Sequence, residues 1–142
     1  MENEALPKVL RWEMDDKYDI LEAEHYGYTK LPNPIIHRRK FLFDKKINVL
    51  KIYDFFEGKG MHVYEIHFHF PAMPLALKNG VLKTNVSEGQ NISISPGLKE
   101  VKAELKEGWI SPSYGIKSKA PYLYYSITAR APASFCFVFS IN

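Results

Sequence analysis

The stretch SFCFVFSI at residues 134–141 decides the fold class. Its apolar side chains recur at every second position, on the side shared by Phe135, Phe137, Phe139 and Ile141. Successive side chains of a β-strand point to opposite faces, so a period of two predicts a strand with one face in a core. The other side carries Ser134, Cys136, Val138 and Ser140, which predicts a face that is solvent-exposed or lightly packed.

The same alternation recurs along the chain, with turn signals between the segments. Residues 101–106 place Val, Ala and Leu on one side and only charged residues on the other. Glycine-bearing turn signals follow one another at about the 8–12 residue spacing typical of sandwiches. They are Gly58-Lys59-Gly60, Asn79-Gly80, Ser87-Glu88-Gly89, Pro96-Gly97 and Glu107-Gly108. We therefore expect an all-β fold, an antiparallel two-sheet β-sandwich with little or no helix.

Two finer predictions concern single segments. Residues 47–57 and 61–70 are both strand-like, and the glycines between them predict a hairpin, since glycine tolerates tight reversals. Residues 15–24 fit either a helix capped by Asp15-Asp16 or a strand. We favour the strand, because the aromatic pair Tyr26 and Tyr28 suits a pleated surface.

Length and composition narrow the class of protein. A chain of 142 residues has the size of one domain, so we expect a single β-sandwich domain over residues 1–142. Its 46% hydrophobic and 25% charged residues argue against disorder. The formal charge of +3 is too mild for a nucleic-acid binder, and no apolar run is long enough to cross a bilayer. The lone Cys136 cannot form an internal disulfide.

The first residues lack the form of a secretory signal, and we expect a piece of a longer chain. The cell compartment stays open, with a periplasmic or secreted parent as one possibility.

Histidines and arginines form two patterns that could indicate a binding site. On a strand, His67 and His69 share a face with Glu65 and could offer two imidazoles to zinc, with His25 or His37 as guessed further ligands. A pair of histidines without a further ligand motif is weak evidence for a metal site, so we favour histidines that are hydrogen-bonded within the fold or exposed at the surface.

The basic run at residues 37–40, if it is a strand, places His37 and Arg39 on one face and Arg38 and Lys40 on the other. Arg38 could bind an acidic glycan group, although a salt-bridged sheet face is the simpler interpretation.

Aromatic residues suggest where a glycan could bind. In residues 121–130, Tyr122 and Tyr124 share a face that could stack sugars or be buried, and we favour burial. Trp109, Tyr114 and Lys117 lie in a segment with Pro112 and Gly115 that we expect to be a loop, where recognition tends to reside. The chain has no Gly-rich phosphate loop, no nucleophile elbow and no paired-cysteine metal motif.

Taken in order, several segments resemble the C-terminal β-sheet domain of heparinase II/III-like polysaccharide lyases. They are His37-Arg38-Arg39 leading into Phe41-Leu42-Phe43, residues 54–62 (DFFEGKGMH), Phe68-His69-Phe70, residues 108–117 (GWISPSYGIK) and Ala120-Pro121. The likeness covers the chain from about Glu22 onward. Each segment is weak alone, and the ordered set is moderately specific.

The resemblance implies an N-terminal helical toroid joined to this β-sandwich, and cleavage of uronate-containing glycans by β-elimination. That reaction needs a base near C5 and groups that stabilise an enolate-like charge. The family's catalytic tyrosine and histidine lie largely in the toroid. The chain also lacks the His-Ala-Asp and His-Asn segments that hold a structural metal in family members. We therefore assign no catalytic residue, no metal site and no cofactor.

The function expected from this reasoning is that of a lyase C-terminal sandwich, inactive alone, which supports the toroid and lines the substrate cleft. The expected partners are the toroid and an acidic polysaccharide, with no nucleic acid and no membrane. Trp109, Tyr114, Lys117 and Arg38 are the expected substrate-binding residues. The alternatives are a non-catalytic carbohydrate-binding module and a structural interaction domain.

Overall fold

The computed structural model describes residues 8–28, 34–97 and 101–141, and these residues form strands and turns with no helix. The strands are β1 (Lys8–Met14), β2 (Tyr18–Tyr28), β3 (Ile35–Asp44), β4 (Val49–Gly58), β5 (Met61–His69), β6 (Leu75–Lys78), β7 (Val81–Thr84), β8 (Ile92–Pro96), β9 (Lys102–Ser113), β10 (Ile116–Arg130) and β11 (Ala133–Ile141). All recorded strand pairs are antiparallel. The all-β prediction is confirmed.

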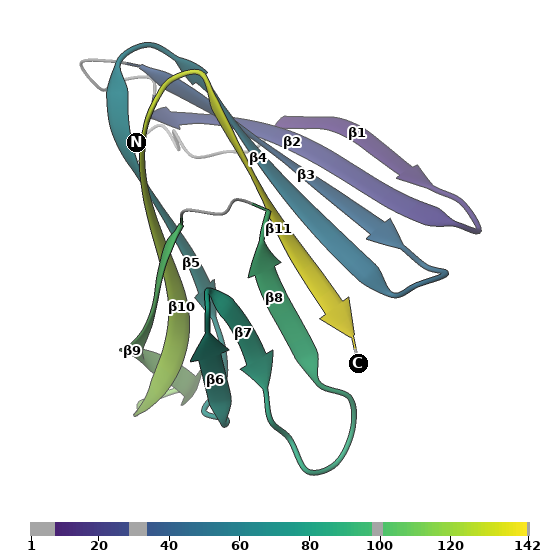
Figure 1. Cartoon of the computed structure of the whole chain (residues 1–142), viewed down its shortest axis with the longest axis vertical. Coiled ribbons are helices and arrows are strands. Elements are labelled where there is room, and N and C mark those ends of the chain that lie inside the picture. Colours follow the sequence, from purple (N-terminus) through teal and green to yellow (C-terminus); the bar gives the residue numbers. More distant parts are fainter. Residues whose placement is uncertain (1–7, 29–33, 98–100, 142) are drawn as a thin grey trace.

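The strands form two sheets of unequal width that face each other (Figure 1). The large sheet has eight strands in the order β1-β2-β3-β4-β11-β8-β7-β6, and the small sheet has three in the order β5-β10-β9. The prediction of an antiparallel two-sheet sandwich is therefore also confirmed.

The core lies between the small sheet and the central strands of the large sheet. Tyr125 and Leu123 of β10 are fully buried there, against Phe137 of β11. The rings of Tyr125 and Phe137 have centroids 4.7 Å apart. The alternation predicted for residues 134–141 is confirmed, because Phe135 and Phe137 are buried on the core side.

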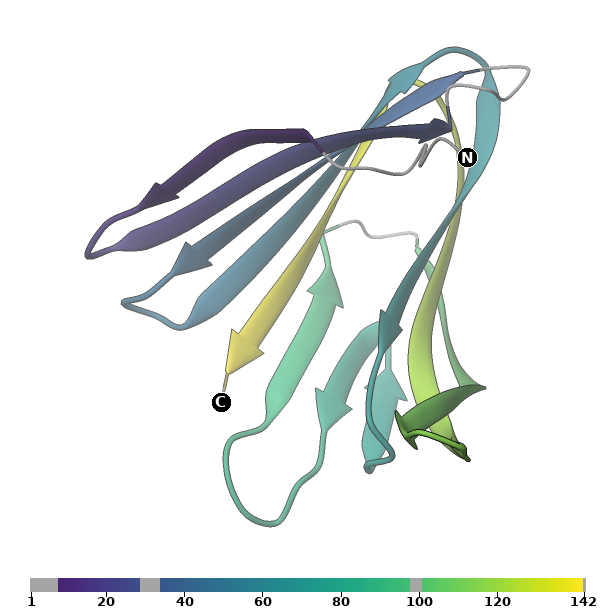
Figure 2. The same cartoon turned by 180° about the vertical axis from the view of Figure 1, so that it is seen from behind.

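The core face of the large sheet continues beyond the small sheet. One row of paired residues crosses five strands of this face: Trp12, Leu21, Phe41, Ile52 and Phe137. Phe137 is 1% exposed and Ile52 5%, whereas Trp12 at the other end is 67% exposed. Both views show β1, β2 and β3 fanning away from the small sheet (Figures 1 and 2). We call the part of the core face on β1 to β3, which lies beyond the small sheet, the shelf.

The predicted hairpin of residues 47–57 and 61–70 is wrong. β4 and β5 follow each other in the chain, but β4 pairs with β3 and β11 while β5 pairs with β10. The glycine-containing connection therefore carries the chain from one sheet to the other. Gly58 and Gly60 both have positive φ angles, of 156° and 82°, which suits such a crossing.

Two other local predictions have opposite outcomes. Residues 18–24 belong to β2, so the strand favoured over a helix is confirmed. The loop expected around Trp109 and Lys117 is wrong, because both lie on paired strands joined by a turn at Tyr114-Gly115. Pro112 lies in β9, which is an edge strand, the position in a sheet where proline is found. Within the described ranges, no helix could cross a membrane.

Candidate functional site

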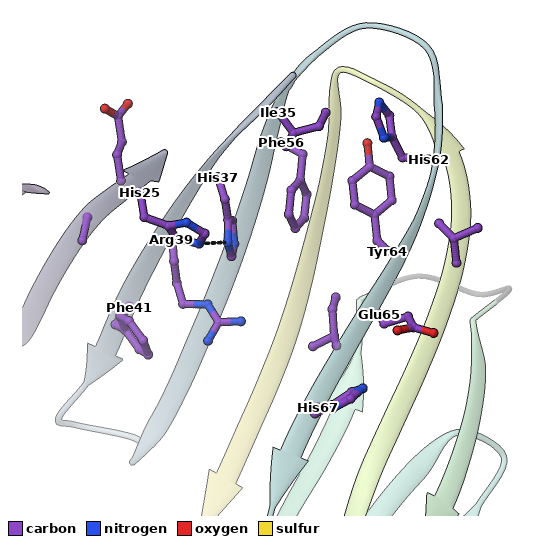
Figure 3. Close-up of a pocket in the computed structure, with 14 residues that line it drawn as sticks. His25, Ile35, His37, Arg39, Phe41, Phe56, His62, Tyr64, Glu65 and His67 are labelled. Atoms are coloured by element: carbon purple, nitrogen blue, oxygen red, sulfur yellow. Dashed lines mark hydrogen bonds between the residues drawn. The ribbon is translucent and has the colours of Figure 1, made fainter. Parts of the chain in front are cut away.

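A cavity opens between the two sheets, at the junction of the core and the shelf. Its volume is about 570 Å³, within the range of small-molecule sites. Figure 3 shows His25, His37, Arg39 and Phe41 on the wall formed by β2 and β3, and His62 and Tyr64 on the β5 wall. Phe56 of β4 also lines it. We call this cavity the inter-sheet pocket.

A hydrogen-bonded chain of four side chains runs from β2 to β4 along this wall. Asp54 is fully buried, and its Oδ1 lies 2.6 Å from His37 Nε2. Arg39 donates from Nε to Oδ1 at 2.7 Å and from Nη2 to Oδ2 at 3.1 Å. His37 Nδ1 lies 2.8 Å from His25 Nε2. The register explains the pairing, since Arg39 lies opposite Asp54 and His25 opposite His37.

The carboxylate fixes how protons are placed along this chain. An ionised Asp54 only accepts hydrogen bonds, so His37 donates from Nε2. When His37 carries one proton, on Nε2, its Nδ1 accepts and His25 donates to it from Nε2. In that state the hydrogen bonds run from His25 through His37 to Asp54.

Burial and neighbours shift the pKa values at the two ends of the chain. Burial acts to raise the pKa of Asp54, but the hydrogen bonds from His37 and Arg39 outweigh it and hold that pKa below its usual value. The pKa of His25 is also lowered, first by burial and then by His37 and Arg39. Asp54 opposes this shift. The two lowered pKa values therefore favour the neutral form of His25 and the ionised form of Asp54.

The Arg39 guanidinium neutralises Asp54. Arg39 contacts both carboxylate oxygens, which is the charge-assisted geometry that arginine forms with carboxylates. No group of three or more His, Cys, Asp or Glu suited to a metal ion occurs within residues 8–28, 34–97 and 101–141. His67 and His69 share the exposed face of β5 with Glu65, as predicted, and their rings lie beside Tyr122.

The family model for the heparinase II/III-like C-terminal domain matches residues 1–134. The chain belongs to this family. No curated protein matches the chain.

Solved structures of heparinases have the same fold as this heparinase II/III-like domain. The heparan sulfate lyase HepC of Pedobacter heparinus is 18% identical, with a TM-score of 0.83. Another structure, described as heparinase III, is also 18% identical, with a TM-score of 0.78. Each likeness covers 95% of this chain and 21% of the other. The heparinase II/III-like chain thus spans about a fifth of the length of these proteins.

Three of the four predicted substrate-binding residues lie together on the β9–β10 hairpin of this domain. Trp109 is 67% exposed and Tyr114, at the turn, is fully exposed. Lys117 follows the turn on β10 and is also exposed. Lys119, opposite Trp109, places its Nζ 5.7 Å from the indole ring centroid. The hairpin therefore offers aromatic and cationic groups to solvent.

Arg38, the fourth predicted residue, is elsewhere. It lies on β3 of the large sheet, on the face opposite to Arg39. Its guanidinium forms ion pairs with Glu22 at 3.2 Å and with Glu57 at 3.8 Å, and it lies over the ring of Phe55. This agrees with the salt-bridged interpretation of the basic run.

The burial favoured for Tyr122 and Tyr124 is wrong in part. Both side chains are only half-buried, on the outer face of the small sheet, and the fully buried tyrosine is Tyr125 on the other face. Tyr124 donates to Glu65 at 2.7 Å and lies under Lys106, whose Nζ is 3.9 Å from the ring centroid. The outer face stays partly open because no third layer covers it among the described residues.

Sequence reasoning missed the cluster around Asp54. It noted His25 only as a guessed zinc ligand, placed His37 in the basic run and among the guessed ligands, and gave Asp54 no role. The signal that could have found the ion pair is the β3–β4 hairpin, in which Arg39 and Asp54 are equally far from the turn at residues 45–48. A register assigned to that hairpin would have placed them opposite each other.

Stability is expected to fall as the pH falls, in two stages. The pKa of His25 is lowered, so its stabilising contribution is complete above the unfolded-state value of about 6.5 and is lost progressively below it. The pKa of Asp54 is also lowered, so its contribution is lost below about pH 4. Urea unfolding across this range measures both stages. His25→Gln should remove the first stage, and an unchanged profile in that variant would contradict the assignment.

Proposed function

We propose that this chain is the sandwich part of a polysaccharide lyase, which packs on an N-terminal helical toroid and forms one wall of the substrate cleft. The parent reaction is β-elimination of a uronate-containing glycan. The observation that carries the proposal is the match to the heparinase II/III-like C-terminal domain over residues 1–134. Family membership gives the domain, and the toroid and the reaction are parts of the proposal.

The shelf supports the packing role. Val9, Trp12 and Met14 of β1 are each more than half exposed, although Trp12 and Met14 continue the core face of the sheet. Exposed apolar surface of this kind marks places where another protein surface binds. The rest of the lyase chain is the partner proposed for it.

The β9–β10 hairpin and the pocket supply the groups that a cleft wall needs. Exposed Trp109 and Tyr114 can lie against sugar rings, while Lys117 and Lys119 can attract an acidic polymer. Arg38 is already held in two ion pairs on the other sheet and is a weaker candidate.

The test is to mix the isolated chain, and separately the full parent protein, with heparan sulfate and with other uronate-containing polysaccharides, and to follow the ultraviolet absorbance of unsaturated uronate. We expect turnover from the parent and none from the chain alone. Turnover by the chain alone, or an inactive parent, would contradict the proposal.

A carbohydrate-binding module is the second candidate, favoured by the half-open outer face around Tyr122 and Tyr124. It predicts that the isolated chain retains the polysaccharide without cleaving it and that Tyr124→Ala weakens this retention. The same mixtures, separated by size, measure it.

A further inference from the structure

We propose that the inter-sheet pocket binds the carboxylate of an acidic sugar, which Arg39 receives while the His25–His37 pair takes up a proton. The choice of a sugar acid rests on the proposed function. The choice of a carboxylate rests on the geometry of the pocket itself.

Arg39 has donors left for an anion. Its side chain is 34% exposed and lines the pocket. Asp54 uses one N–H of Nε and one of Nη2, and the remaining N–H groups form no hydrogen bond with any residue in the described ranges. A guanidinium has five N–H donors in a fork that matches a carboxylate. Arg39 can therefore hold Asp54 on one side and a second carboxylate on the other.

A polar group on the opposite wall also lacks a partner. The Tyr64 side chain is 6% exposed and its hydroxyl forms no hydrogen bond with a described residue. Buried tyrosine hydroxyls usually have a partner, so this one points to a ligand group. Figure 3 shows Tyr64 and His62 across the pocket from Arg39 and His25. A sugar with a hydroxyl on one side and a carboxylate on the other would satisfy both walls.

Charge balance couples the anion to a proton. Asp54 and Arg39 cancel, so a bound carboxylate adds one uncompensated negative charge unless an imidazole becomes charged. Burial, His37 and Arg39 lower the pKa of His25, and a nearby anion acts in the opposite direction. The charged or titratable groups that line the pocket or act on the pair are Glu24 of β2, Arg39 of β3, Asp54 of β4, and His62, Tyr64, Glu65 and His67 of β5. His25 and His37 line the same pocket and are already joined by a hydrogen bond.

Apolar surface completes the site. Phe41 and Phe56 line the pocket, and Phe56 lies parallel to His37 with ring centroids 4.4 Å apart. Ligand sites commonly combine an apolar lining with a few placed polar groups. The C–H faces of a sugar ring suit this lining.

The experiment titrates glucuronate into the chain by calorimetry between about pH 5 and pH 7, and follows the ring resonances of its five histidines by NMR. We expect resonances of His25 and His37 to move and that of His69, outside the pocket, to stay. Affinity should rise as the pH falls, by up to about ten-fold per pH unit for one coupled proton. Glucose should not bind. No glucuronate binding, or equal affinity for acetate, would overturn the proposal.

Two variants separate the roles of the residues. Arg39→Lys keeps the charge beside Asp54 but removes the fork, and should lower affinity about ten-fold. Arg130→Lys, the same change at an exposed arginine of β10 outside the pocket, should not. His25→Gln keeps a hydrogen-bonding side chain without a titrating group, and should bind with no pH dependence. Affinity that is unchanged in Arg39→Lys, or pH dependence that persists in His25→Gln, would overturn it. If Arg39→Lys does not fold, His25→Gln decides.

The outcome is independent of the lyase assay. If the parent protein is inactive but the chain binds glucuronate, the proposed function is contradicted and the pocket assignment is supported. If the parent is active but the isolated chain does not bind glucuronate, only the pocket assignment is contradicted.

Discussion

Replacing Arg39 by alanine is expected to lower the free energy of unfolding by about 3 kcal/mol. The change leaves the fully buried Asp54 carboxylate with His37 as its remaining charge-stabilising partner. Removing one member of a buried ion pair costs more than the pair contributes, because the other charge stays out of water. The Arg39 side chain is about one-third exposed, but this does not reduce the expected loss. The charge left without its partner is that of Asp54, which is fully buried. Urea unfolding followed by circular dichroism measures the loss.

The matched control for this change is Arg38→Ala. Arg38 is the next residue on β3, but its partners Glu22 and Glu57 are accessible to water, and the expected loss is about 1 kcal/mol or less. The Arg39 variant should also unfold at a higher pH during acid titration, because the pKa of Asp54 loses one of its lowering influences. Equal losses in the two variants would show that burial of Asp54 does not control stability.

Replacing Gly58 by alanine is expected to cost about 3 kcal/mol, at the upper end of overpacking effects. An added Cβ would lie 2.4 Å from the carbonyl oxygen of Pro34 and 2.7 Å from Cδ1 of Ile35. The first of these atoms belongs to the backbone and cannot rotate away. Gly58 is the last residue of β4, where the chain leaves the large sheet. The clash can therefore be relieved only if the backbone that connects the two sheets shifts. Thermal and urea unfolding measure the effect.

Gly89→Ala serves as the control for the glycine prediction. Gly89 also has a positive φ, of 96°, but an added Cβ there would meet no atom within 4 Å. Only backbone strain remains, and the expected loss is about 1 kcal/mol. If Gly89→Ala is as destabilising as Gly58→Ala, strain and not close approach explains both.

Local alternation was enough to predict the two faces of residues 62–69 and of most of residues 134–141, because apolar and polar side chains alternate in a half-buried strand. Tyr64 and Ile66 are buried while Glu65, His67 and His69 are exposed, and Phe135 and Phe137 are buried. Pairing between strands is different, since it depends on residues far apart in the chain. The wrong hairpin of β4 and β5 shows this, because a glycine turn between two strands is compatible both with a reversal in one sheet and with a crossing to another.

The candidate site was accessible to sequence reasoning only in pieces. Trp109, Tyr114 and Lys117 are close in the chain, and the β9–β10 hairpin keeps them close in space. The outer position of Tyr122 and Tyr124 was not predictable from their strand alone, because both faces of β10 carry large apolar or aromatic side chains. Which face is buried depends on where the large sheet lies.

From its residues alone the chain was identifiable as an antiparallel two-sheet sandwich of the heparinase II/III-like type, since face alternation and ordered motifs are properties of short segments. The buried Asp54 with Arg39, the proton chain to His25 and the open shelf follow from three-dimensional arrangement. A carboxylate's burial depends on register and on the sheet that covers it, and the small sheet covers β4 and β11 but leaves β1 bare. No single segment carries that information, because it arises from the unequal widths of the two layers.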